Sequence, residues 1–206
     1  MVNSINNAVQ RRHLRITAPS PWVKRFASLI APGGRVLDLA CGNGRHARHM
    51  IEQGCSAVVL DRDVAAVADL AGSPKVHVIE ADLEDGTGWP LAGQRFDGII
   101  VVNYLHRPIF PHLLDGLADG GVLIYETFAR GNEVFWRPRN PDHLLRSGEL
   151  LAIVGDRLQI VAYEHGLVET GPLPGVIQRI CAVNDRARST RADGEPPIHR
   201  VEGPPD

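Results

Sequence analysis

The sequence predicts an α/β domain built on a mostly parallel sheet. Its predicted strands are short, continuous apolar runs rather than alternating patterns, which is typical of a sheet buried on both faces. Helical or loop segments separate the first five runs, as crossovers between parallel strands require. The chain has 206 residues, of which 44% are hydrophobic, so its length and composition suit one domain of this class.

The predicted elements follow one another in a regular order. Ser20 and Pro21 have the N-cap and N1 preferences of a helix that continues to Ile30, with its apolar residues on one face. Further helices are predicted at 43–53, 64–71 and, interrupted near Gly148, 142–154. The strands are predicted at 35–40, 57–60, 76–79, 96–102, 122–128, 157–165 and 176–183.

The segments outside these elements predict the domain organisation. The first 19 residues are polar and predict an N-terminal arm or lid before a domain at 20–184. Residues 129–141 predict a long loop, and the last two strands are joined by a hairpin-type junction, GPLPG. Residues 185–206 carry Pro, Gly and charge with four apolar residues, which predicts a disordered tail.

Composition argues against several classes of protein. A formal net charge of −2 indicates no general attraction to nucleic acid or anionic membranes, so nucleic acid is not the expected partner. The three cysteines are scattered without a C-x-x-C pair, which indicates neither a disulfide framework nor a structural metal site. The N-terminus lacks the apolar region of a signal peptide, and no apolar run approaches the ~18 residues of a membrane span. The expected location is the cytoplasm.

The stretch LDLACGNGRHA, residues 37–47, is the first candidate site and has two interpretations. Gly42, Gly44 and Ala47 fit the loose dinucleotide pattern G-x-G-x-x-A. Glycines after a parallel strand let backbone N–H groups approach a ligand, and the following helix N-terminus adds partial positive charge. A pyrophosphate and a carboxylate would both suit this loop, so the glycines alone do not identify the ligand.

Acidic residues at the strand ends narrow the choice. Asp61 ends the second predicted strand, where a carboxylate accepts hydrogen bonds from ribose hydroxyls. Asp82 follows the third strand, in position to receive an adenine amino group. Asp38 lies within the first strand, where a buried carboxylate needs a partner. A cationic ammonium would serve, whereas a pyrophosphate would be repelled. A ligand with ribose, adenine and an ammonium group therefore matches S-adenosylmethionine better than NAD.

Five successive segments resemble the motifs of class I S-adenosylmethionine-dependent methyltransferases: VLDLACGNGRHA, VVLDRD, ADLED, FDGIIVVNYL and LADGGVLIYETF. The resemblance covers about residues 20–183, and CGNGR is similar to the tellurite-resistance and thiol or small-molecule branch. It implies a Rossmann-like three-layer sandwich with a seven-stranded sheet, in which the seventh strand inserts antiparallel between the fifth and sixth. The family commonly has Gly where Ala40 stands, which leaves the ligand contacts of Ala40 and Cys41 open.

The resemblance also implies roles for individual residues. The glycine loop approaches the methionine portion and the ribose, Asp38 meets the ammonium, and Asp61 holds the ribose hydroxyls. Residues that follow the third strand contact the edge and face of the adenine, and the residue at the end of the fourth strand lies near the transferring methyl. The cofactor-binding positions so implied are Asp38, Gly42, Asn43, Gly44, Asp61, Arg62, Asp82, Leu83 and Asn103.

Acceptor chemistry is expected after the fourth and fifth predicted strands. In NYLHRPIF, Tyr104 and His106 are candidate catalytic groups, with His106 either a base or a loop cap. Arg107 either clamps an anionic acceptor or pairs with a surface acid. Glu126 either receives a substrate proton or ties down the next loop through Arg130 or Arg137. Trp136 and Arg137 are candidate acceptor-binding residues on that loop, which is either a lid or a solvated loop.

Three other features have alternative explanations. His46 and His49 have the i, i+3 spacing of a metal pair, but no third ligand is evident. Cys41, near a helix N-terminus, is either a thiol of lowered pKa or a small packing residue. The run RRHLR at 11–15 either contacts RNA phosphate, covers the cofactor or forms a solvated arm.

The sequence thus predicts methyl transfer from S-adenosylmethionine to a small-molecule acceptor by in-line displacement. Three alternatives remain: an RNA or protein methyltransferase, an NAD-dependent oxidoreductase, and a non-catalytic cofactor-binding module. A strongly basic surface would favour the first. Thermal stabilisation by S-adenosylhomocysteine against NAD would decide the second, and cofactor binding without turnover would identify the third.

Overall fold

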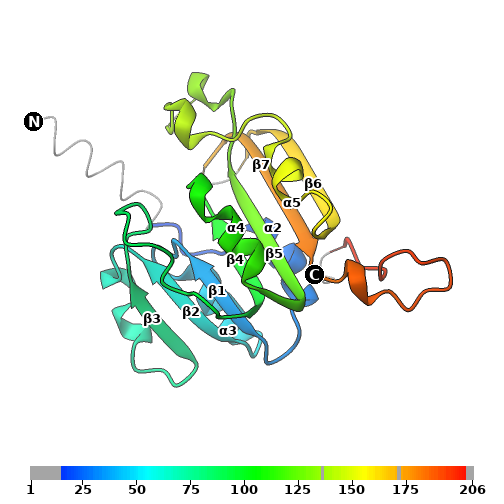
Figure 1. Ribbon diagram of the computed structural model, residues 1–206. Coiled ribbons are helices and arrows are strands. Elements are labelled where there is room, and N and C mark those ends of the chain that lie inside the picture. Colours follow the sequence, from blue (N-terminus) through cyan, green and yellow to red (C-terminus); the bar gives the residue numbers. More distant parts are fainter. Residues whose placement is uncertain (1–14, 136, 171–172, 203–206) are drawn as a thin grey trace, which may run out of the picture.

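The computed structural model describes residues 15–135, 137–170 and 173–202, and its centre is a single mixed sheet (Figure 1). Within the described residues, seven strands follow the order β3-β2-β1-β4-β5-β7-β6. β1 to β5 pair in parallel, and β7 runs antiparallel between β5 and β6. The predicted topology is therefore confirmed. The strands are β1 (Arg35–Leu39), β2 (Ser56–Asp61), β3 (Val76–Glu80), β4 (Phe96–Val102), β5 (Leu117–Phe128), β6 (Gln159–Val168) and β7 (Gly175–Val183).

Helices cover both faces of the sheet, which is why its central strands are continuously apolar. Alternate residues point to opposite faces, so Leu37 joins the hydrophobic cluster under α4 and α5, whereas Val36 joins the one under α2. Figure 1 shows α4 and α5 in front of the sheet and α2 behind it. In the part of the chain that the structure describes, the α-helices are α2 (Pro21–Phe26), α3 (Arg45–Glu52), α4 (Phe110–Asp115) and α5 (Glu149–Val154).

The first described helix begins as the sequence predicts but ends earlier. The Ser20 hydroxyl accepts a hydrogen bond from the Trp22 N–H at 3.1 Å, and Pro21 occupies the first turn. After Phe26 the chain tightens into the 3₁₀ helix η2 (Ala27–Leu29). Trp22 is buried, and its indole N–H donates to the Ile180 carbonyl of β7 at 3.2 Å, which fixes α2 against the sheet.

Two other predicted helices differ in detail. Residues 64–71 form the 3₁₀ helix η3 (Ala65–Leu70) rather than an α-helix, and Val67 is its buried residue. A segment with so little apolar surface to bury gains little from packing, which is where most helical stability comes from. Residues 142–154 are less helical than predicted: residues 144–148 are not helical, and α5 begins only after Gly148, whose φ is 71°. The remaining 3₁₀ helices are η4 (Arg107–Ile109), η5 (Asn132–Val134), η6 (Pro141–His143) and η7 (Arg186–Arg188).

The C-terminal segment contacts the domain at separate points. The Arg25 guanidinium of α2 donates to the Val201 carbonyl at 2.8 Å, and the Gln159 amide donates to the Pro197 carbonyl at 2.9 Å. Composition predicted disorder for 185–206, whereas the structure places polar contacts along the described part of that segment.

Candidate functional site

The strand registers bring the predicted site residues to one edge of the sheet. Leu39 pairs with Leu60 on β2 and with Val101 on β4, and Asp61 pairs with Glu80 on β3. Four neighbouring strands therefore end at the same level. Along this edge lie, in order, Asp82, Asp61, the loop of residues 40–44 and Asn103. This is the edge of a parallel sheet at which ligands bind.

The loop of residues 40–44, called the glycine loop below, is a tight left-handed turn. Ala40, Gly42 and Gly44 have φ values of 53°, 57° and 69°. The Cys41 N–H donates to the Leu60 carbonyl at 3.1 Å, which fixes the loop to the end of β2. A Cβ atom on Gly44 would lie 2.8 Å from a methyl carbon of Val67, so close packing as well as φ requires glycine there.

Replacing Ala40 with glycine is expected to raise the free energy of unfolding by about 0.5–1 kcal/mol. Left-handed φ strains a residue with a Cβ, and relief of that strain exceeds the entropy that an added glycine loses on folding. Urea denaturation would measure the change. Gly44→Ala, the reverse replacement in the same loop, should destabilise the fold. Equal destabilisation by both variants would contradict this explanation.

Asp61 and Asp82 retain free capacity to accept hydrogen bonds. Half-buried Asp61 accepts the Gly42 N–H at 2.8 Å on one oxygen and the Asp63 N–H at 3.2 Å on the other, which leaves a lone pair on each. Asp82 is exposed and accepts the Glu84 N–H at 2.9 Å. Beside them, Arg62 is exposed and Leu83 packs partly buried against the core.

Asp38 is more enclosed than its predicted role suggests. Only 1% of it is exposed, and its carboxylate accepts the Ala47 N–H at 2.9 Å in the first turn of α3. Its other oxygen lies 3.8 Å from the Nδ1 atom of buried His46. Asp38 thus caps α3 at the positive end of its dipole, and its contact with a ligand ammonium stays a prediction.

Side chains of the glycine loop and α3 hold the segment that precedes α2. The Asn43 amide donates to the Ile16 carbonyl at 2.9 Å, and the Arg45 guanidinium donates to the Ala18 carbonyl at 3.2 Å. Asn43 therefore makes a structural contact, and its contact with the cofactor stays a prediction. Sequence reasoning missed Arg45, because its partner is a backbone carbonyl that no motif marks.

The end of β4 turns sharply at Asn103. Its φ is 60°, and its N–H makes a last hydrogen bond with the Glu126 carbonyl of β5 at 2.8 Å. The next carbonyl, that of Tyr104, accepts the buried Tyr125 hydroxyl at 2.6 Å. Burial raises the pKa of the Tyr104 phenol, and nearby Glu84 adds to that shift. A phenol with a raised pKa is a weak candidate for a general base at neutral pH.

Arg107 is engaged with the chain between η6 and α5. Its guanidinium binds both carboxylate oxygens of Glu149, at 2.7 and 3.0 Å, and donates to the carbonyls of Asp142 and Leu144 at 2.6 and 3.0 Å. These contacts match the alternative in which Arg107 pairs with an acid, although Glu149 is only 16% exposed. To bind an anionic acceptor as well, the Arg107 guanidinium would have to contact it in addition to these partners.

His106 lies immediately before η4 and is half-buried. Its carbonyl accepts the Ile109 N–H at 3.3 Å, so its backbone begins the turn. Within the described residues, no hydrogen bond is made by its ring. The ring therefore remains available for the base role that the sequence predicts.

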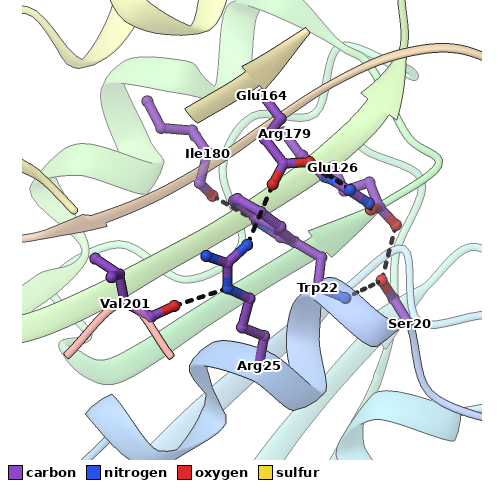
Figure 2. A network of polar contacts seen from close by, with 8 residues as sticks. All are labelled: Ser20, Trp22, Arg25, Glu126, Glu164, Arg179, Ile180 and Val201. Atoms are coloured by element: carbon purple, nitrogen blue, oxygen red, sulfur yellow. Dashed lines mark hydrogen bonds and ion pairs between the residues drawn. The ribbon is translucent and has the colours of Figure 1, made fainter. Parts of the chain in front are cut away.

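Glu126 belongs to a charged network on the α2 side of the sheet (Figure 2). One oxygen accepts the Ser20 hydroxyl at 2.9 Å and the other accepts Arg179 of β7 at 3.3 Å. Arg179 also donates to Glu164 of β6, whose other carboxylate oxygen accepts a hydrogen bond from the Arg25 guanidinium at 3.1 Å. Glu126 therefore has a structural role through Ser20 and Arg179 rather than through the predicted Arg130, which pairs with Glu133. Its role as a proton acceptor stays a prediction.

The loop after β5 carries exposed apolar and cationic residues. Val134 and Phe135 are 79% and 48% exposed, and Arg130 pairs with Glu133 at 2.5 Å. Arg137 is exposed, and Trp136 lies outside the described residues. Their acceptor-binding roles stay predictions.

A surface hollow of about 590 Å³ lies at the opposite edge of the sheet, where it is lined by Arg95, Leu117 and Arg157 among others.

The interpretation of Cys41 as a thiol of lowered pKa loses support. Burial raises the pKa of the Cys41 thiol, and the Asp38 and Asp61 carboxylates add to the shift, so Cys41 is a packing residue. Among the described residues, no three His, Cys, Asp or Glu side chains are grouped to bind a metal ion. None of the helices in the described part of the chain is long and apolar enough to traverse a membrane.

Comparison with known proteins decides between the two interpretations of the glycine loop. Residues 11–152 match the family model of a methyltransferase domain. The chain belongs to this methyltransferase domain family. The cofactor of the family is S-adenosylmethionine, and the dinucleotide interpretation of the loop is set aside.

Individual relatives cover different shares of the chain. A tRNA U34 carboxymethyltransferase of Methylococcus capsulatus is 35% identical over 118 residues, which are 50% of this chain and only 36% of that protein. The crystal structure of TehB from Haemophilus influenzae aligns with a TM-score of 0.60 at 17% identity, over 77% of this chain and 59% of TehB. The N-methyltransferase NodS from Bradyrhizobium japonicum, in complex with S-adenosylhomocysteine, aligns with a TM-score of 0.60 at 15% identity, over 86% and 97%.

The methyltransferase cofactor fits the residues at the sheet edge. Asp61 offers a free lone pair on each oxygen, and the glycine loop lies beside it. Acidic groups predominate here and suit ribose hydroxyls, an adenine amino group and a cationic donor. They would oppose the two negative charges of a pyrophosphate.

Proposed function

We propose that this chain transfers a methyl group from S-adenosylmethionine to a small-molecule acceptor. The observation that carries the proposal is the succession of Asp82, Asp61, the glycine loop and Asn103 along one sheet edge. Each group suits one part of the cofactor in that order: adenine, ribose, methionine and the transferring methyl. Membership of the methyltransferase domain family supports the same assignment.

In this proposal the chain binds the donor through carboxylates and backbone. Asp61 accepts the ribose hydroxyls on its two free lone pairs, Asp82 accepts the adenine amino group, and Leu83 contacts the adenine face. Gly42 and Gly44 bring backbone close to the ribose and methionine portion. The Gly42 N–H, already held by Asp61, couples the ribose site to the loop.

The bound cofactor supplies an activated methyl group on a sulfonium. The chain's main task is therefore to position the acceptor about 3 Å from that methyl, in line with the sulfur. A base is needed only where the acceptor carries a proton. Glu126 is held in an ion pair with Arg179 and Tyr104 has a raised pKa, so we favour His106 as that base.

RNA is a second candidate acceptor, favoured by the curated tRNA relative. That relative is matched over 36% of its length, so its substrate transfers to this chain only as a hypothesis. The net charge of −2 argues for the small molecule, because binding to phosphate backbones depends on neutralising cations.

Donor consumption against a panel of acceptors would test the proposal. We expect formation of S-adenosylhomocysteine with at least one thiol, amine, carboxylate or oxyanion, and none above background with total RNA. Turnover with RNA alone would replace the small-molecule proposal by the RNA one. Cofactor binding without turnover on any acceptor would identify a non-catalytic module.

A further inference from the structure

Residues 16–20, called the strap below, are held at their first end by side chains at the end of β1. The Asn43 amide of the glycine loop donates to the Ile16 carbonyl at 2.9 Å. The guanidinium of Arg45, the first residue of α3, donates to the Ala18 carbonyl at 3.2 Å. Both bonds are made to backbone carbonyls, so they fix the path of the chain rather than one side chain. This end of the strap is therefore tied to the proposed methionine end of the cofactor site.

The second end of the strap is held by β5. The Ser20 hydroxyl donates to a carboxylate oxygen of Glu126 at 2.9 Å, and Figure 2 shows this contact at the start of α2. Ser20 is only 4% exposed. The carbonyl of the same glutamate accepts the Asn103 N–H at 2.8 Å, where β4 ends. This end of the strap therefore lies beside the residue expected near the transferring methyl.

The strap joins two strands that are not neighbours. β4 lies between β1 and β5 in the sheet, so a segment tied to the ends of both passes the carboxyl end of β4. Two strand spacings amount to about 10 Å, whereas the steps from Ile16 to Ser20 span at most about 14 Å. The strap is thus long enough to make this crossing but too short for a wide detour.

We propose that the strap closes the methionine end of the cofactor site and slows cofactor release. Arg45 is then a positioning residue, because it acts on the cofactor by holding the strap in place. The proposal rests on the proposed function, since it needs the cofactor at this edge of the sheet. It adds a segment from outside the five motifs to the donor site.

Hydrogen–deuterium exchange of the unaltered protein, with and without S-adenosylhomocysteine, would test whether the strap closes on the cofactor. We expect the ligand to slow exchange at the backbone amides of the strap as well as those of the glycine loop, because closure lowers the frequency of local opening. Slower exchange in the glycine loop without any change in the strap would overturn the proposal. No change in either segment would refute the cofactor site on which it rests.

Variants at the two ends would test the anchors through the dissociation rate of S-adenosylhomocysteine, measured by surface plasmon resonance. Arg45→Ala removes the bond to the Ala18 carbonyl. Ser20→Gly removes the bond to Glu126, and glycine is accepted as an N-cap of α2. Each variant should speed dissociation about 3- to 10-fold, the effect of losing one hydrogen bond. The two variants share no contact, so a common effect would point to the segment that they both hold.

Lys24 offers a matched control for the loss of charge. It is exposed on α2, so Lys24→Ala removes one positive charge near the strap and should leave dissociation unchanged. Faster dissociation in Arg45→Ala alone would overturn the proposal, because Arg45 would then contact the cofactor directly. Lower thermal stability of both end variants with unchanged dissociation would overturn it as well, since their contacts would then be merely structural.

Discussion

Replacing Arg107 with alanine is expected to lower the free energy of unfolding by about 2–3 kcal/mol. The guanidinium makes two hydrogen bonds with Glu149 and two with backbone carbonyls, and these contacts fix the chain between η6 and α5. Removing it leaves the little-exposed Glu149 carboxylate without its cation, a loss larger than that of an ordinary surface pair. Urea denaturation at neutral pH would measure the change.

Arg157→Ala is the matched control for this prediction. Arg157 also pairs with a carboxylate, that of Asp115 at 2.5 Å, but both partners are more than half exposed. Exposed ion pairs contribute little, so this variant should unfold almost like the unaltered protein. Equal losses in the two variants would contradict the structural role assigned to Arg107. If Arg107→Ala instead raised the acceptor KM and left stability unchanged, the predicted role of Arg107 in binding the acceptor would be supported.

The same pair predicts a dependence on pH. Burial opposes ionisation of Glu149, but hydrogen bonds from Arg107 and the Arg146 N–H outweigh it, and the pKa of Glu149 is lowered. A lowered folded-state pKa stabilises the fold above the ordinary value of about 4.5, and that stability is lost as pH falls through the lowered one. Arg107→Ala should therefore lose less stability on acidification than the unaltered protein does.

The sequence predicted the sheet because local pattern determines its strands. Residues 96–102 form β4 with the predicted boundaries, since a strand buried on both faces needs an uninterrupted apolar run. β5 begins at Leu117, five residues before its predicted start at Val122. The polar and glycine residues at 119–121 conceal that start. Leu117 nevertheless pairs with Phe96 across a register shift.

Some residues of the candidate site could likewise be predicted from local pattern and others could not. The position of Asp61 at the ligand-binding edge was predictable, because a residue that ends a parallel strand lies at that edge whatever its distant partners are. The partners of Glu126 were not, because Ser20 is 106 residues away and Arg179 reaches it only through the antiparallel insertion of β7. Arg107 and Glu149, 42 residues apart, meet by tertiary packing that no local pattern encodes.

Replacing Asp61 with alanine is expected to weaken S-adenosylhomocysteine binding by about 1–3 kcal/mol, or roughly 5- to 150-fold. The variant leaves the ribose hydroxyls without their acceptor and frees the Gly42 N–H that shapes the glycine loop. Isothermal titration calorimetry would measure the affinity. Asp63→Ala removes a carboxylate two residues away, which accepts the Ala65 N–H at the start of η3, and should bind normally.

A cofactor analogue separates the two consequences of losing Asp61. S-adenosylhomocysteine without its ribose 2′-hydroxyl should bind the unaltered protein more weakly than the full ligand does, because Asp61 loses a donor. Asp61→Ala should bind both ligands about equally, since the hydroxyl then has no partner to lose. If the variant still prefers the full ligand by the original ratio, Asp61 acts only by shaping the loop. A folded variant with unchanged affinity would remove Asp61 from the cofactor site altogether.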